Sequence, residues 1–224
     1  GLKGWHVMFF IEALIEMFAG SVEHDKLAAL KSSWNTDSMV KVFTKFREYI
    51  DKGFFPEAFE RKRGYDSKLL LFSKKAIMSL EGPNMELYIL NENQNPDLYG
   101  YFKLPLSIKG NRMSGFIEMM QFNAALNEEK LSAAMTFIDY MHSPESISKY
   151  GSLVKQPVPR KDNILPENMT IVPQMLKDLN KFGSYTISDQ GFPQDVVNIL
   201  FKAQNFVIQR VMTPEQAVEY MQKS

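Results

Sequence analysis

The sequence of 224 residues contains no cysteine. Disulfide bonds, thiolate metal sites and a cysteine nucleophile are therefore excluded. An excess of charge is missing too, because 26 Lys and Arg residues balance 26 Asp and Glu residues. A chain without a net field of either sign is not expected to bind nucleic acid or an anionic lipid surface.

Long apolar runs and catalytic motifs are also missing. The longest apolar stretch, Val7–Ile11, is far shorter than the ~20 residues that cross a bilayer. The three histidines, His6, His24 and His142, are far apart, and none has the spacing of a metal-ligand motif. Neither a phosphate-binding glycine loop nor a nucleophile elbow occurs. We therefore expect no metal, no cofactor and no enzymatic activity.

What the sequence does contain is helical periodicity. Met8 and Ile11 begin an apolar stripe over residues 5–18, and Glu12 and Glu16 lie off that stripe. The pattern predicts a helix that buries one face and leaves both carboxylates outside it.

Further elements follow from caps, breakers and spacing. Helices are expected over 36–52, 66–72, 127–141, 172–180 and 196–211, and from Pro144 and Thr213 onward. Strands are expected over Ala76–Leu80, Tyr99–Leu104 and Gly115–Met120, an extended connection over 156–173 and a loop over 183–193. Strands interspersed with helices predict an α/β domain whose sheet is covered on both faces.

Four landmarks occur in a characteristic order. They are FSKKAIMSLEGP (Phe72–Pro83), LYGYFKLP (Leu98–Pro105), LSAAMTFIDYMHSPE (Leu131–Glu145) and TPEQAVEYM (Thr213–Met221). Together they resemble the second half of an extracellular solute-binding protein of family 1, the maltose-binding-protein-like receptors of sugar ABC importers. The resemblance implies a type II periplasmic-binding-protein-like fold, α/β and helix-rich with a mixed sheet, which here lacks most of the N-terminal lobe.

The resemblance also implies a division of the chain. Residues 1–106 and 157–224 would belong to the C-terminal lobe, and residues 107–156 would be an excursion into the N-terminal lobe. Because the strands beneath that excursion would be missing, we expect exposed apolar surface around Met135, Phe137, Ile138 and Met141. Such a surface could form a dimer.

The sharpest implication for a ligand site concerns the turn Gly82-Pro83-Asn84. In the family this turn faces the cleft and its Trp often stacks on sugar. Asn84 stands in the Trp position, where it can bond hydroxyl groups but cannot stack. Ser114-Gly115 resembles the segment in which the chain returns to the first lobe and its backbone can approach a ligand; an ordinary turn glycine is the alternative.

Other candidate site residues are aromatic and polar groups at element ends. Trp5 could stack on a sugar ring, with His6 as its polar companion, although core packing explains Trp5 equally well. Asp189 and Phe192 lie in a loop that often contributes to the site in the family. Trp34, in a polar loop, resembles a surface position of the family.

The resemblance implies the substrate-binding component of an ABC importer, which binds a carbohydrate such as an oligosaccharide between two lobes and delivers it to a membrane permease. It would be an extracellular lipoprotein, anchored through a missing N-terminal signal and lipobox segment. We expect the present chain alone to bind sugar weakly or not at all. A helix-rich interaction module is the alternative, and convergence in space of residues 82–84 and 189–193 would favour a ligand site.

Overall fold

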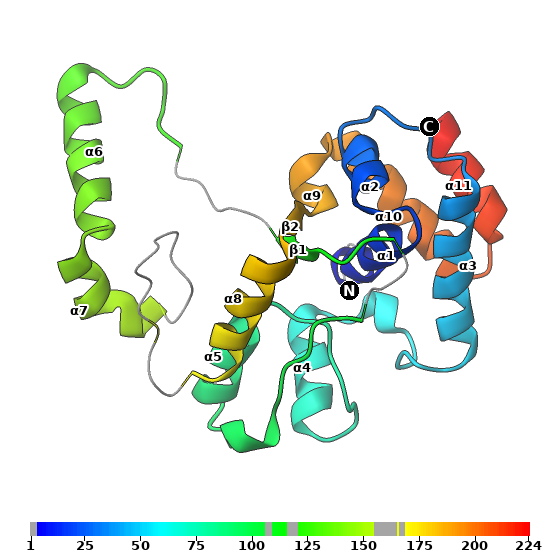
Figure 1. The fold of residues 1–224 in the computed structure, drawn as a ribbon, viewed down its shortest axis with the longest axis horizontal. Coiled ribbons are helices and arrows are strands. Elements are labelled where there is room, and N and C mark those ends of the chain that lie inside the picture. The colour runs from blue at the N-terminus through cyan, green and yellow to red at the C-terminus, as the bar shows by residue number, and fades with distance from the viewer. Residues whose placement is uncertain (1–3, 106–108, 116–120, 155–164, 166–168) are drawn as a thin grey trace. The chain divides into compact units, whose positions relative to one another are not determined.

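The computed structural model describes residues 4–105, 109–115, 121–154, 165 and 169–224, and most of these residues are helical (Figure 1). The helices are α1 (Trp5–Phe18), α2 (Ser21–Ala28), α3 (Asp37–Asp51), η1 (Phe59–Arg61), α4 (Gly64–Phe72), α5 (Asn84–Asn91), η2 (Pro96–Leu98), α6 (Glu128–Met141), α7 (Pro144–Val154), α8 (Ile171–Phe182), α9 (Ser188–Gly191), α10 (Gln194–Ile208) and α11 (Pro214–Lys223). Strands β1 (Met113–Gly115) and β2 (Ser184–Thr186) form a small parallel sheet. The chain is thus a helix-rich α/β protein.

The chain divides into two compact units. The first contains residues 1–80, 103–116 and 178–224, and the second contains residues 81–102 and 117–177. These boundaries differ from those of the segments 1–106, 107–156 and 157–224 that the resemblance implies. The assignment of those segments to lobes of a complete receptor stays a prediction.

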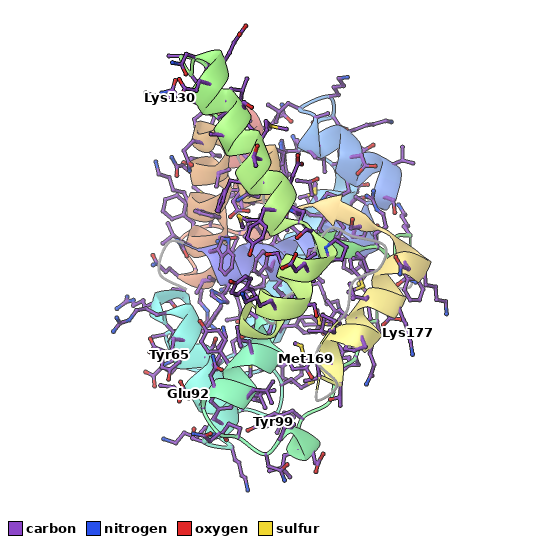
Figure 2. The ribbon with its side chains drawn as sticks, turned by 90° about the vertical axis from the view of Figure 1, so that its left-hand side faces the viewer. Tyr65, Glu92, Tyr99, Lys130, Met169 and Lys177 are labelled. Carbon is purple, nitrogen blue, oxygen red and sulfur yellow. The ribbon has the colours of Figure 1, made fainter. Side chains whose placement is uncertain are left out.

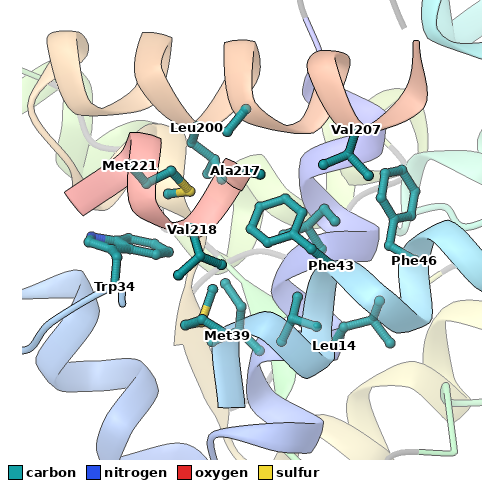
Figure 3. Close-up of a cluster of buried hydrophobic side chains, with 14 of the residues drawn as sticks. Leu14, Trp34, Met39, Phe43, Phe46, Leu200, Val207, Ala217, Val218 and Met221 are labelled. Atoms are coloured by element: carbon teal, nitrogen blue, oxygen red, sulfur yellow. The ribbon is translucent and has the colours of Figure 1, made fainter. Parts of the chain in front are cut away.

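The core of the first unit lies where α1, α3, α10 and α11 meet (Figure 3). Figure 3 shows Leu14, Met39, Phe43, Phe46, Leu200, Val207, Ala217, Val218 and Met221 packed together. Each large side chain buried in this way stabilises the fold by about 1.5–3 kcal/mol. Trp34 joins this core with only 6% of its surface exposed, so the predicted surface position is wrong. The polar residues around it in sequence mark a loop but do not determine where the indole points.

The two carboxylates of α1 are buried, contrary to the sequence prediction. Glu12 and Glu16 both have 0% exposure. Glu16 accepts hydrogen bonds at 3.0 Å from Nε and Nη2 of Arg112, and His24 Nδ1 lies 2.9 Å from its second oxygen. Burial alone would raise the pKa of Glu16, but the hydrogen bonds from His24, Arg112 and Ser21 outweigh it and hold the pKa well below its usual range. A charged carboxylate can be buried when hydrogen bonds and an opposite charge compensate for the water that it loses.

Close backbone approach at Gly110 supports this arrangement. A Cβ atom on Gly110 would lie 2.4 Å from the carbonyl oxygen of Glu16, and Lys109 N–H donates to Met17 at 3.1 Å. The segment before β1 is therefore bound along the end of α1. This contact brings Arg112 to Glu16.

In the second unit a buried carboxylate caps a helix from a distance in sequence. Glu86 on α5 accepts hydrogen bonds from the N–H groups of Thr170, Ile171 at 2.9 Å and Val172 at 2.7 Å. N–H groups in the first turn of a helix have no acceptor within the helix, and here the Glu86 carboxylate supplies it. The helix dipole also favours a negative charge at this end of α8. Figure 2 shows this unit with Glu92, Tyr99, Met169 and Lys177 labelled.

Helix α6 in the same unit has no buried residue among those described. Met135, Phe137 and Met141 are 45%, 59% and 38% exposed, as predicted. Ile138 is half-buried. In Figure 2 the side chains of α6 stand out from the helix, with Lys130 in its first turn.

Most predicted helices are confirmed within a few residues, including their caps. Thr36 accepts from Met39 N–H, Asn127 accepts from Lys130 N–H, and Thr213 forms a capping box with Gln216. Capping depends on local geometry, which is why the sequence pattern predicts it.

The predicted strands are mostly wrong. Residues 76–80 and 99–104 form no strand, residues 84–91 form the unpredicted helix α5, and the predicted loop over 183–193 contains β2 and α9. The third predicted strand overlaps β1 only at Gly115, since residues 116–120 lie outside the described part. Most of the expected 156–173 connection also lies outside it. Alternating apolar residues become a strand only where a neighbouring strand pairs with them.

Candidate ligand-binding site

A groove of about 630 Å³ lies on the first unit. Its lining comes from the start of α1, the start of α4, helix α9 and one face of α10: Trp5, His6, Arg63, Gly64, Asp189, Gln190, Gln194, Val197 and Phe201. Apolar rings and polar groups of four kinds, guanidinium, carboxylate, amide and imidazole, share this lining. Such a mixture is typical of a site that binds a small polar ligand with an apolar face.

The indole of Trp5 is fixed in the groove by a hydrogen bond over a long sequence distance. Trp5 Nε1 donates to Asp189 Oδ2 at 2.7 Å. The rings of His6 and Phe9 lie against the indole with centroid distances of 4.9 Å and 4.4 Å. The hydrogen bond and the two ring contacts hold the indole in one orientation. A held aromatic ring loses little conformational entropy when a ligand covers it.

His6 occupies its place because residue 64 is glycine. A Cβ atom on Gly64 would lie 2.5 Å from His6 Cε1 and 2.8 Å from His6 Nε2. The backbone at the start of α4 therefore approaches the imidazole closely. Asp66 caps this helix start by accepting from Arg63 N–H at 2.9 Å, and the exposed Arg63 side chain remains at the rim of the groove.

Two acidic groups, Glu12 and Asp189, lie close to one another where α9 meets α1. Burial raises the pKa of Glu12 to about 8, the two hydrogen bonds from Ser188 oppose the rise, and the charge of Asp189 adds to it. Asp189 Oδ1 is buried and has no hydrogen-bond partner among the described residues. Asp189 therefore lines the groove with one unused oxygen, and Glu12 is joined to the neighbouring residue Ser188.

Of the predicted site residues, the structure brings together Trp5, His6 and Asp189 in this groove. Phe192 does not line it; its ring packs against that of Trp34, with centroids 5.8 Å apart. The residues Ser114 and Gly115 lie on β1, opposite Tyr185 and Thr186 of β2.

The predicted turn of Gly82, Pro83 and Asn84 belongs to the second unit, where Asn84 begins α5. The loop around Asp189 belongs to the first unit. Convergence of the two loops stays a prediction.

Sequence reasoning missed several lining residues. Gln194, Val197 and Phe201 recur at intervals of three and four on α10, so helical periodicity could have grouped them with the already suspected Asp189 loop. Arg63 and Gly64 carry no sequence signal, because only the fold brings the start of α4 to His6.

The described part of the chain contains no candidate for two other kinds of site. No group of three or more His, Asp or Glu side chains there could hold a metal ion. Among the same residues, no helix is long and apolar enough to cross a membrane.

No protein-family model matches the chain, and no curated protein matches it. A solved structure titled "Chitin oligosaccharide binding protein" is similar over 98% of this chain, with a TM-score of 0.84 and 18% sequence identity. The match covers 56% of that protein, so the present chain spans little more than half its length. At this identity the likeness shows the fold: the chain folds like the matched part of that protein.

Proposed function

We propose that this chain is part of the substrate-binding component of a sugar ABC importer, with an oligosaccharide as its ligand. The observation that carries the proposal is the similarity of 98% of the chain to a protein that binds chitin oligosaccharides, at a TM-score of 0.84. The proposed receptor would bind its ligand between two lobes, deliver it to a membrane permease and catalyse no reaction. It would work outside the cell, anchored by a lipid.

The chemistry of the groove supports a sugar ligand. The rings of Trp5 and Phe201 can pack on the C–H face of a pyranose, and the side-chain amides of Gln190 and Gln194 can bond hydroxyl or N-acetyl groups. In this lining the positive charge of Arg63 offsets the negative charge of Asp189. A neutral, hydroxyl-rich molecule fits this lining better than a polyanion.

The completeness of the site is part of the proposal. Because the chain spans 56% of its structural neighbour, a whole receptor would draw further ligand contacts from sequence beyond these residues. We therefore propose weak or no binding by the present chain and tight binding by a chain that includes the remaining lobe.

The test is a thermal-shift and calorimetric titration of both chains with N-acetylglucosamine oligomers, with maltose oligomers as the matched control. We expect saturable stabilisation of the longer chain and at most a small shift of the present chain. In the longer chain, Trp5→Ala should weaken binding by about five- to 150-fold, since a lost stacking contact costs roughly 1–3 kcal/mol. Absence of any sugar effect on a folded longer chain would refute the assignment.

One observation favours a second candidate, a protein-interaction module. Helix α6 exposes Leu131, Met135, Phe137, Tyr140 and Met141 to 38% or more. Sedimentation velocity over a range of concentrations tests it: self-association that Met135→Lys abolishes would support an interaction surface on α6, and a monomer at every concentration would oppose a dimer.

A further inference from the structure

The most unusual group near the groove is Glu12, a buried acid two helical turns after Trp5 on α1. It is 0% exposed, and its Oε1 accepts hydrogen bonds from both the backbone N–H and the hydroxyl of Ser188. The backbone bond measures 2.5 Å. These two bonds attach the beginning of α9 to α1.

The attachment leads directly to the groove. Ser188 is followed by Asp189, which accepts the indole hydrogen bond of Trp5 at 2.7 Å. Glu12, Ser188, Asp189 and Trp5 thus form a ring of contacts that starts and ends on α1. Movement of Glu12 relative to Ser188 must change the position of Asp189, and with it the orientation of the indole.

Two oxygens in this ring lack partners. Glu12 Oε2 and Asp189 Oδ1 are both buried, and neither has a hydrogen-bond partner among the described residues. Two carboxylates with buried, unpaired oxygens repel one another and are poorly solvated, so one of them is more stable with a proton. Glu12 is the more deeply buried of the two, because Asp189 is only half-buried.

The surroundings of Glu12 agree with this assignment. Burial raises its pKa to about 8, with the negative Asp189 adding to the rise. Tyr185 on β2 also interacts with Glu12, and burial raises the pKa of its phenol well above the usual range, so it remains neutral. The neighbouring helices α3 and α10 contribute apolar side chains such as Phe43 and Leu200 to the core.

We propose that Glu12 is a positioning residue: its carboxyl group accepts both hydrogen bonds from Ser188 and so holds Ser188 and Asp189 in the place where Asp189 fixes the Trp5 indole. Ionisation transfers its proton to solvent and leaves a second negative charge beside Asp189. Repulsion between the two carboxylates then displaces Asp189 and changes the surroundings of the indole that donates to it. A loss of sugar binding at alkaline pH would follow from this, and that part of the inference rests on the proposed function. The positioning of Trp5 by Glu12 does not.

Intrinsic fluorescence tests the positioning without any ligand. The chain has two tryptophans, Trp5 in the groove and Trp34 in the core. Between pH 6 and pH 10 we expect the emission of the wild-type chain to change in one transition with its midpoint at about 8. Trp5→Phe, which keeps Trp34, should show no transition and thereby assign the signal to Trp5.

Two variants test the role of Glu12. Glu12→Gln keeps the length of the side chain and an acceptor for Ser188 but cannot ionise, so it should show no transition. Ser188→Ala removes one hydrogen bond that favours the ionised form of Glu12, and it should move the midpoint upward by about one pH unit. A residue with a purely structural role would not move the midpoint in this way.

The inference is overturned if the wild-type chain shows no transition, if the transition persists in Glu12→Gln, or if Ser188→Ala leaves the midpoint in place. Circular dichroism checks that Glu12→Gln is folded, and Ser188→Ala tests the inference independently if it is not. Because the readout needs no sugar, failure of this inference and failure of the proposed function are separate results.

Discussion

Helices α1 and α6 have the same length, 14 residues, and very different surroundings. Helix α6 has a good N-cap in Asn127, whereas Gly4 caps α1 without a side-chain hydrogen bond. Yet α1 has eight buried residues, and α6 has none among those described. Local capping and tertiary burial are therefore independent sources of helix stability. A sequence reports the first more directly than the second.

The largest effect should come from the buried ion cluster of α1. Glu16→Ala leaves Arg112 and His24 without their shared carboxylate, and loss of one partner of a buried pair typically costs about 3–5 kcal/mol. Urea unfolding followed by tryptophan emission measures this loss. Glu48→Ala on the exposed face of α3 is the control and should leave the unfolding midpoint almost unchanged. Equal effects of the two variants would contradict the importance of the buried cluster.

A matched pair of truncations compares the two helices directly. Ile11→Ala in α1 should cost about 2–5 kcal/mol, because it leaves a cavity where the side chain is 0% exposed. Met135→Ala in α6 should change stability by no more than about 0.5 kcal/mol, because that side chain is already 45% exposed. Chemical denaturation of both variants measures the contrast. A large loss in Met135→Ala would mean that α6 is covered in solution.

The pH dependence of stability should reveal Glu12. Its pKa rises from 4.5 to about 8 on folding, so the folded state holds a proton that the unfolded state has released. The stability that this group contributes is present in full below pH 4.5 and is lost as the pH rises to about 8, at no more than about 1.4 kcal/mol per pH unit.

Urea unfolding of wild type and Glu12→Gln at intervals from pH 5 to pH 9 isolates this contribution. The difference between their free energies of unfolding should fall towards high pH and level off above about 8. A constant difference would show that Glu12 ionises normally in the folded protein.

A smaller, local effect is expected at the cap of α6. Asn127→Ala removes the acceptor for Lys130 N–H, which typically costs about 1 kcal/mol of helix stability. Amide hydrogen exchange should become faster in the first turns of α6 and remain unchanged in α1. Faster exchange in both helices would mean that the two units unfold together.

The accuracy of the sequence predictions follows the range of the interactions involved. The bounds of α1 and the caps at Thr36, Asn127 and Thr213 are confirmed, because periodicity and capping involve residues a few positions apart. The strands over 76–80 and 99–104 are not found, because a strand requires a partner that spacing alone does not supply.

The candidate site follows the same rule. Trp5, His6 and Asp189 could be suspected from their residue types and their places at element ends. That Trp5 bonds Asp189 depends on a contact across 184 positions, and that His6 lies on Gly64 depends on the packing of α4. A local sequence pattern cannot predict contacts between residues so far apart in the sequence.

By itself, the sequence determined where most helices begin and end, and it excluded thiol chemistry and a net charge. The tertiary structure decided which faces those helices bury. It placed Glu12 and Glu16 inside, although both lie off the apolar stripe of α1, because Ser188 and Arg112 arrive from distant segments to satisfy the carboxylates. The physical reason is that burial of a polar group depends on its partners, and those partners are brought together only by the fold.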